Sequence, residues 1–234
     1  MCVQGKSIIV SIAVLFILAG FTGGAGAAVK HVVVIDPAHG GSETGVQLAR
    51  KTYEKDLTLK IGTLIGAGLA KIGNIDARLT RSQDVTLSIA KRWEFAGKAK
   101  ADLFVSIHVN AGFGNQSRGY EVYFSGFDTD PSRKENAEIV VKDMAQNEYR
   151  NESVRFAHIF QRNFSKVFPR QDRGLRDAPF PVYDGLAMPA VVVELGFATH
   201  VKSKKQLNDK KVQQAIADAI VKSIREFFVV SGAQ

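Results

Sequence analysis

The sequence predicts a single three-layer α/β domain, in which helices flank a mixed, mostly parallel sheet. Apolar runs rich in β-branched residues recur along the chain and are typical of strands buried on both faces. Segments with the apolar spacing of helices lie between them, and neither an internal repeat nor a low-complexity linker divides the sequence. Strands that alternate with helices favour parallel pairing, because each crossover returns the chain to the same end of the sheet.

The start of the chain is expected to be a signal peptide over residues 1–27, followed by one domain over residues 28–234. A short region that ends at Lys6 precedes an apolar run over residues 8–18, and Ala25-Gly26-Ala27 is typical of a cleavage site. The alternative is a retained membrane anchor, but a bilayer span needs about 20 apolar residues. We therefore expect export to the periplasm or the extracellular cell wall, without stable membrane insertion after cleavage.

The composition is that of a globular protein with a basic surface. Hydrophobic residues make up 45% and charged residues 23%, which excludes disorder and coiled-coil architectures. The net charge of +8 favours a polyanionic partner, and for an exported monomer we expect a cell-wall polymer rather than nucleic acid. For the lysines between Lys202 and Lys211, a solvated surface without a partner is the preferred interpretation. The one cysteine, Cys2, lies in the segment expected to be removed, so a metal site would use nitrogen and oxygen ligands.

The first half of the chain predicts two strand and helix pairs. Residues 31–36 (HVVVID) form a buried strand that ends before a proline and a glycine-rich turn, and residues 54–69 have a broad apolar helical face. A short strand is expected over residues 75–80. A second helix is expected over residues 85–100, capped by Asp84 or Thr86. Its candidate core contacts are Leu87, Ile89 and Trp93.

The second half predicts three strands and further helices. Residues 103–109 form a buried strand, and the alternation over residues 120–124 indicates an edge or antiparallel strand. Residues 133–168 have a helical pattern in two pieces. Residues 190–195 form the last buried strand, and residues 203–228 close the chain as one amphipathic helix.

Three of the apolar strands lead into side chains that can bind a metal or carry a proton: His39, His108 and Glu194. Glu54 begins the first helix, just beyond a strand-to-helix turn. Because ligand sites of such folds lie beyond the carboxyl ends of the strands, we expect the four side chains to converge. Two histidines and a carboxylate are the ligands of a catalytic zinc site that keeps one position open for water. A further carboxylate can then accept a proton, and Glu194 suits this role because burial would raise its pKa.

Each of these residues also has a structural interpretation when it is taken alone. A histidine at a strand end is commonly a hydrogen-bonded structural residue, and Glu54 could be a helix N-terminal acid favoured by the helix dipole. Glu194 could pair with a buried arginine such as Arg81 or Arg173. Because all four side chains are expected at the same edge of the sheet, a single metal site that they form together is the favoured interpretation. The other histidines lack this placement and are expected to be structural or surface residues: His31, His158 and His200.

At these residues the sequence resembles the zinc-dependent N-acetylmuramoyl-L-alanine amidases of bacterial cell separation and of spore or phage lysis. The resemblance extends over residues 32–207. It rests on an ordered set of motifs: VIDPAHGG at 34–41, Glu54, LTR at 79–81, VSIHVNA at 105–111, GYEVY at 119–123, RGL at 173–175 and MPAVVVELGF at 188–197.

The resemblance implies that His39, Glu54 and His108 bind Zn²⁺ and that Glu194 is catalytic. It also implies the reaction, which is cleavage of the amide between the lactyl group of N-acetylmuramic acid and L-alanine in peptidoglycan. The chemistry of the residues alone extends only to metal-assisted amide hydrolysis. The alternatives are a zinc peptidase or deacetylase of the cell wall, and a non-catalytic wall-binding module. Arg81 is expected to be a structural ion-pair partner, and Asn110 could reach substrate or cap a turn.

Overall fold

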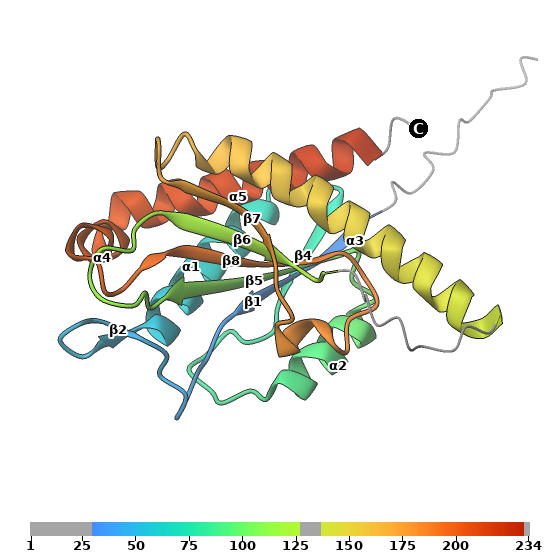
Figure 1. Ribbon diagram of the computed structural model, residues 1–234, viewed down its shortest axis with the longest axis horizontal. Helices are drawn as coiled ribbons and strands as arrows, with labels where there is room; N and C mark the ends of the chain where they lie inside the picture. The colour runs from blue at the N-terminus through green and yellow to red at the C-terminus, as the bar shows by residue number, and fades with distance from the viewer. Residues whose placement is uncertain (1–29, 127–136, 232–234) are drawn as a thin grey trace, which may run out of the picture.

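A six-stranded sheet lies between two unequal layers of helices in the computed structural model, which describes residues 30–126 and 137–231 (Figure 1). The expected signal peptide lies outside the described residues. None of the helices in the described ranges is both long enough and apolar enough to cross a bilayer. The strands are β1 (His31–Pro37), β2 (Gln47–Ala49), β3 (Thr52–Tyr53), β4 (Ile75–Leu79), β5 (Leu103–Asn110), β6 (Tyr120–Phe124), β7 (Asp172–Asp177) and β8 (Ala190–Phe197). The helices are α1 (Glu54–Leu69), α2 (Ile89–Ala99), α3 (Ala137–Phe164), the short 3₁₀ helix η1 (Pro181–Tyr183), α4 (Val201–Asn208) and α5 (Lys210–Ser231).

The sheet has the strand order β4-β1-β5-β8-β6-β7, and this confirms the predicted mixed, mostly parallel architecture. The strands β4, β1, β5 and β8 run parallel to one another, so their carboxyl ends meet at one edge. β6 pairs antiparallel with β8, and β7 pairs parallel with β6. The sequence does not predict β7, because its segment (DRGLRD) is polar and largely exposed.

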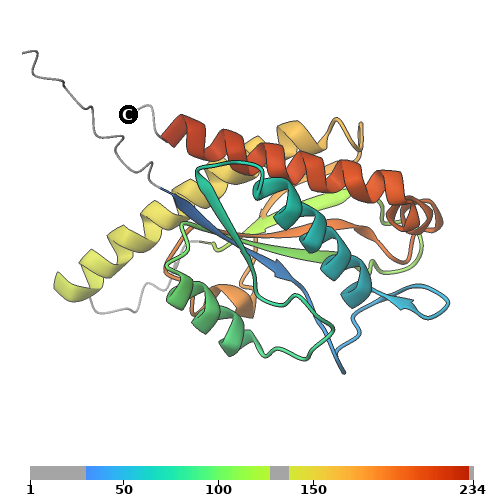
Figure 2. The ribbon, with the colours of Figure 1, turned by 180° about the vertical axis from the view of Figure 1, so that it is seen from behind.

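One face of the sheet is covered by α1, α3 and α5, which form the larger part of the core. Figure 2 shows α1 and α5 side by side across this face. Side chains alternate between the two faces along each strand, and most of the β-branched residues of β1, β5 and β8 lie on this face: Val33, Ile35, Val105, Ile107, Val109, Val191 and Val193. Aromatic side chains of α3 fill the space between the helix and the sheet, and three of them are fully buried: Phe156, Phe160 and Phe164.

The other face is covered only by α2 and η1, around a smaller cluster that includes Val34, Phe104 and Val192. Trp93 of α2 is half-buried, and its indole Nε1 donates to the carbonyl of Val182 in η1 at 2.8 Å. The carboxyl end of β5 remains partly exposed on this face, where the side chain of His108 is 28% exposed.

Helix α2 begins later than predicted. Its N-cap is Ser88, whose Oγ accepts from the backbone of Lys91, so the helix starts at Ile89 rather than at residue 85. The two expected caps have another role. Asp84 accepts from the backbone of Gly41 at 2.7 Å and Thr86 from that of Ser42 at 3.0 Å, so the segment before α2 supports the turn after β1. Ile89 is 41% exposed and is not a core contact.

Two other helical predictions have wrong boundaries. α3 is one continuous helix from Ala137 rather than two pieces, and the predicted start at residues 133–136 lies outside the described residues. The C-terminal segment forms two helices rather than one, because Asp209 has an extended backbone with ψ 124°. The Asp209 carboxylate then accepts from the backbone of Lys211, at the start of α5, at 2.7 Å.

Candidate active site

Three predicted ligand residues converge at the carboxyl edge of the sheet. His39 follows β1, Glu54 begins α1 and His108 lies near the end of β5. Their donor atoms all lie within 4.8 Å of one another. Nε2 of His39 is 3.2 Å from Oε2 of Glu54, and Nδ1 of His108 is 3.2 Å from Oε1 of the same carboxylate. The imidazole rings are nearly perpendicular, with centroids 5.5 Å apart, so each presents a nitrogen to a common point.

Glu54 is held in place by two backbone amides as well as by the histidines. Its Oε1 accepts from the amide of Val109 at 2.9 Å, and its Oε2 accepts from that of Val46 at 3.1 Å. Burial raises the pKa of Glu54, but hydrogen bonds and charges from His108 and His39 outweigh it and lower the pKa to about 2. The carboxylate is therefore ionised at neutral pH, as a metal ligand must be.

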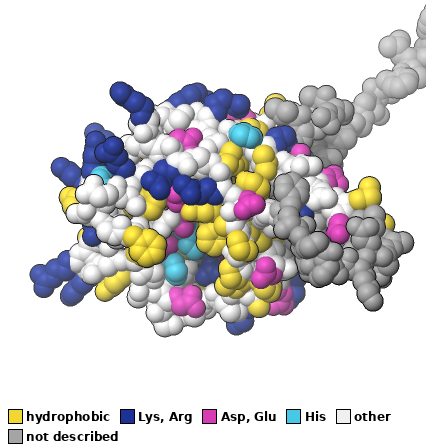
Figure 3. Space-filling view, in the orientation of Figure 1, with side chains coloured by type: hydrophobic (Ala, Val, Ile, Leu, Met, Phe, Trp, Pro, Cys, Tyr) yellow, Lys and Arg dark blue, Asp and Glu magenta, His cyan; other side chains and the backbone are white. Residues whose placement is uncertain are grey.

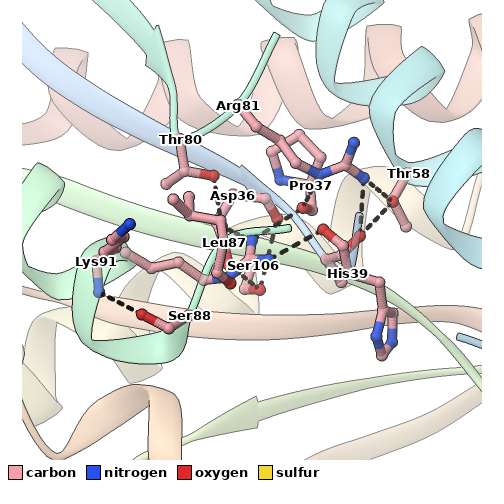
Figure 4. A network of polar contacts seen from close by, with 12 residues as sticks. Asp36, Pro37, His39, Thr58, Thr80, Arg81, Leu87, Ser88, Lys91 and Ser106 are labelled. Carbon is pink, nitrogen blue, oxygen red and sulfur yellow. Dashed lines mark hydrogen bonds and ion pairs between the residues drawn. The ribbon is translucent and has the colours of Figure 1, made fainter. Parts of the chain in front are cut away.

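Two buried arginines hold the loop that carries His39 (Figure 4). Arg81 donates to the carbonyls of Pro37 and Ala38, both at 2.9 Å, and Arg92 donates to those of Pro37 and His39, both at 3.0 Å. His39 has a positive φ of 60°, a conformation that a non-glycine residue adopts only when its surroundings impose it. The arginines supply that constraint, because their planar donors fix successive carbonyls of the turn.

Asp36 anchors one of these arginines. Its Oδ1 accepts from Arg92 at 2.5 Å and from Thr80 at 2.6 Å, and its Oδ2 accepts from Ser106 at 2.8 Å. Asp36 and Arg92 are both almost fully buried, so each depends on the other for charge compensation. The prediction that Arg81 is structural agrees with its contacts, but within the described residues it forms no ion pair, because its donors are used on backbone carbonyls and on Thr58.

Glu194 lies next to His39, Glu54 and His108, and no charged partner for it is found among the described residues. It is paired in register with His108 on β5, so the two side chains project from the same face of the sheet. The residue is 8% exposed, and its Oε2 accepts no hydrogen bond from the part of the chain that the structure describes. Burial, followed by the negative charges of Glu54 and Glu121, raises the pKa of Glu194 to about 8. The alternative that Glu194 pairs with Arg81 or Arg173 is wrong, because neither arginine contacts it.

Arg173 pairs instead with Glu121, which is the register partner of Glu194 on β6. Oε1 of Glu121 lies 2.8 Å from Nε of Arg173 and 3.2 Å from Nε of Arg176. Oε2 accepts from Asn110 at 3.1 Å and from the hydroxyl of Tyr123 at 2.8 Å. Asn110 therefore holds Glu121 rather than capping a turn.

A cleft of about 200 Å³ opens beside the two histidines. Its walls come from the turn after β1, the segment before α2, and η1. Figure 3 shows histidine side chains on an open face, with basic side chains above them and acidic ones below. Apolar side chains line much of the cleft, including Leu87, Ile89 and Phe180.

The group formed by His39, Glu54 and His108 fits a bound divalent cation. Glu54, Glu121 and Glu194 are all buried, and among the described arginines it is Glu121 that is paired, with Arg173 and Arg176. Two neutral imidazoles and one carboxylate are the donor set that Zn²⁺ takes in catalytic sites. A cation among these groups would also compensate Glu194, whose buried carboxylate is otherwise costly.

The remaining histidines lie apart from this cluster, as predicted. His31 stacks on Phe228 with centroids 4.2 Å apart, and His200 caps α4 by accepting from the backbone of Ser203. His158 is exposed on α3. The sequence reasoning missed Arg92, since a single arginine on an amphipathic helix resembles a solvent-facing residue. It also missed the contact of Arg176 with Glu121.

Comparison with known proteins agrees with this geometry. The sequence profile of the N-acetylmuramoyl-L-alanine amidases matches residues 33–226. The chain is 29% identical to AmiA of Escherichia coli K12, over 85% of this chain and 76% of that protein. It is 32% identical to CwlM of Bacillus licheniformis, an N-acetylmuramoyl-L-alanine amidase, over 85% of this chain and 69% of that protein. Against AmiC of Escherichia coli O6:H1 the identity is 27% over 84% of this chain, which spans about half (52%) of that longer relative.

The fold is similar to that of solved amidase domains. The catalytic domain of CwlV from Paenibacillus polymyxa superposes with a TM-score of 0.72 at 30% identity, covering 86% of this chain and 99% of that one. AmiC2 of Nostoc punctiforme superposes with a TM-score of 0.71 at 28% identity, covering 86% and 98%. The chain belongs to the N-acetylmuramoyl-L-alanine amidase family.

Proposed function

We propose that this protein is a zinc-dependent enzyme that hydrolyses the amide between N-acetylmuramic acid and L-alanine in peptidoglycan. The observation that carries the proposal is the convergence of His39, Glu54 and His108 within 4.8 Å, beside the buried, unpartnered carboxylate of Glu194. The identity of the bond that is cleaved is inferred from membership of the amidase family. Export to the periplasm or cell wall, where this substrate lies, is part of the same proposal.

In this proposal His39, Glu54 and His108 hold the cation, and Arg81 and Arg92 keep His39 in its left-handed conformation. Zn²⁺ bound there would polarise the scissile carbonyl and lower the pKa of a water molecule towards about 7. Glu194 accepts a proton from the attacking water and returns it to the leaving nitrogen of alanine. Burial raises the pKa of Glu194 above its ordinary value and so favours the second transfer, because it stabilises the protonated form.

Product analysis after digestion of purified peptidoglycan tests the function. We expect a new lactyl carboxylate and a free alanine amine, and no product when a chelator removes the metal. A free sugar amine would indicate a deacetylase, and a new amine within the stem peptide would indicate a peptidase. Binding to peptidoglycan without any product, in protein loaded with zinc, would favour a non-catalytic wall-binding module.

A further inference from the structure

Two arginines lie beyond Glu194, on the side away from the histidines, and the proposed reaction does not use them. Nε of Arg173 and Nε of Arg176 both face Oε1 of Glu121, at 2.8 and 3.2 Å. The side chain of Glu121 is 4% exposed, whereas those of the arginines are 36% and 45% exposed. The two arginines are therefore held by a buried carboxylate, that of Glu121, while their other sides remain open to solvent.

A bulge in β7 places both arginines on the same face. Tyr120 pairs with Asp172 while Val122 pairs with Leu175, so β7 has one residue more than β6 over this stretch. Side chains alternate along a strand, and residues three apart would otherwise face opposite sides of the sheet. Gly174 has a φ of +92° and absorbs the extra residue. Bulges are common next to active sites, where they redirect a side chain.

The two arginines carry more positive charge and more donors than Glu121 can use. Glu121 offers one negative charge, and its Oε2 is already bound by Asn110 and Tyr123. In residues 30–126 and 137–231 the Nη groups of Arg173 and Arg176 donate to no protein acceptor. A guanidinium offers its Nη donors as a planar fork that matches a carboxylate. The surplus charge and the unused donors therefore fit an anionic ligand.

The arginines lie within reach of a peptide whose amide is at the cluster. His108, Glu194 and Glu121 are register partners on three neighbouring strands, so Glu121 is two strand spacings, or roughly 10 Å, from His108. An extended peptide covers roughly 3.3–3.6 Å per residue. A carboxylate in the first residues after the scissile amide can therefore reach the outer side of the arginine pair.

We propose that Arg173 and Arg176 bind a carboxylate of the residue that follows L-alanine in the stem peptide. The site would favour stem peptides with a free carboxylate at this position over those with a carboxamide, which has no charge to pair with the guanidinium groups. This inference rests on the proposed amidase function, which places L-alanine beside Glu194.

Two matched pairs of ligands test the site. The non-hydrolysable pair is the dipeptide of L-alanine and D-glutamate with its α-carboxylate free, and the same dipeptide as the isoglutamine amide. The γ-carboxyl group is blocked as a methylamide in both, so that the two ligands differ in charge only at the α-position. The substrate pair carries N-acetylmuramic acid on the same dipeptides. Dissociation constants of the first pair and KM and kcat of the second are measured for zinc-loaded wild-type protein, Arg173→Gln and Arg176→Gln. Arg78→Gln is the control, because Arg78 is a strand arginine at the opposite edge of the sheet with a similarly exposed side chain of 44%.

In wild-type protein and in the control we expect the acid forms to bind at least about tenfold more tightly than the amides. Arg173→Gln and Arg176→Gln should each reduce this preference to within about twofold, by raising KM for the acid form with KM for the amide unchanged. Equal binding of acid and amide by wild-type protein would overturn the proposal. So would equal losses on both forms in the two variants, which a purely structural role predicts, or a loss of the same size in the control.

The experiment distinguishes failure of the amidase proposal from failure of the carboxylate-site proposal. If wild-type protein cleaves neither muramoyl substrate nor peptidoglycan, the amidase proposal fails, while the dissociation constants of the dipeptides still decide whether the carboxylate is recognised. If cleavage occurs without any preference for the acid form, only the carboxylate site is wrong.

Discussion

The two faces of the central sheet differ in what covers them and in what they bury. One face packs against α1, α3 and α5 through apolar side chains, with the phenylalanines of α3 at its centre. The other packs against α2 and η1 and buries charged groups: Asp36, Arg92, Glu121 and Glu194. Apolar burial stabilises the fold, whereas buried charges are costly unless they are paired. The comparison indicates that packing on the first face provides most of the free energy of folding. Burial of charged groups on the second face lowers the stability, and these groups form the site.

The largest effect is expected from removing a proposed zinc ligand. His108→Ala should abolish zinc binding and activity, because two remaining ligands hold the ion poorly. Metal content after dialysis and the rate on peptidoglycan measure both. His158→Ala, which removes an exposed histidine of α3, is the control and should keep both. Stoichiometric zinc in His108→Ala protein would contradict the ligand assignment.

A change on the apolar face should instead affect stability alone. Phe160 is fully buried and stacks on Phe164 with centroids 4.5 Å apart. Phe160→Ala should lower the free energy of unfolding by about 3–5 kcal/mol, while kcat per folded molecule stays the same. Denaturant unfolding measures the loss, and Phe113→Ala, at a fully exposed position, should change stability by less than about 0.5 kcal/mol. A large fall in kcat with little loss of stability would contradict the view that this face contributes to stability and not to catalysis.

The arginine that holds the His39 loop should affect metal affinity. Arg92→Lys keeps the charge beside Asp36 but cannot donate to several carbonyls at once. We expect zinc affinity to fall by about 10- to 100-fold, as for other residues that orient a ligand. Competition with a chelator measures this, with Arg78→Lys as the control. Unchanged affinity would show that the turn after β1 holds its shape without Arg92.

A pH dependence of stability is expected in metal-free protein. The pKa of Glu194 is raised from 4.5 to about 8 in the folded state, mainly by burial. Its stabilising contribution is fully present below the unfolded pKa and is lost as the pH rises through the folded value. Between these values the advantage of Glu194→Gln over wild-type protein should grow by up to about 1.4 kcal/mol per pH unit. Urea unfolding at pH 5 and pH 7 with chelator measures it, and a constant difference between the two proteins would place Glu194 in a polar environment.

The sequence predicts the parts of the molecule that depend on apolar runs. It locates the strands that lead to His39, His108 and Glu194, and the convergence of the first two with Glu54 is seen in the structure. It does not predict β7, whose polar segment has no strand pattern and pairs only because β6 offers it an edge. It also misses the role of Arg92 and the bulge at Gly174, because both depend on contacts between residues distant in sequence. The start of α2 is misplaced because Asp84 and Thr86 bind another turn.

The central claim is that the cation ligands and the proton acceptor are separate groups. Glu194→Gln tests it directly, because the amide has nearly the same shape as the carboxylate but cannot take a proton from water. Zinc content and kcat on purified peptidoglycan are measured for this variant and for wild-type protein under the same conditions. We expect full zinc content and a fall in kcat of about 10²- to 10⁴-fold. A near wild-type kcat at normal zinc content would show that another group is the base, and loss of zinc would show that Glu194 is itself a ligand.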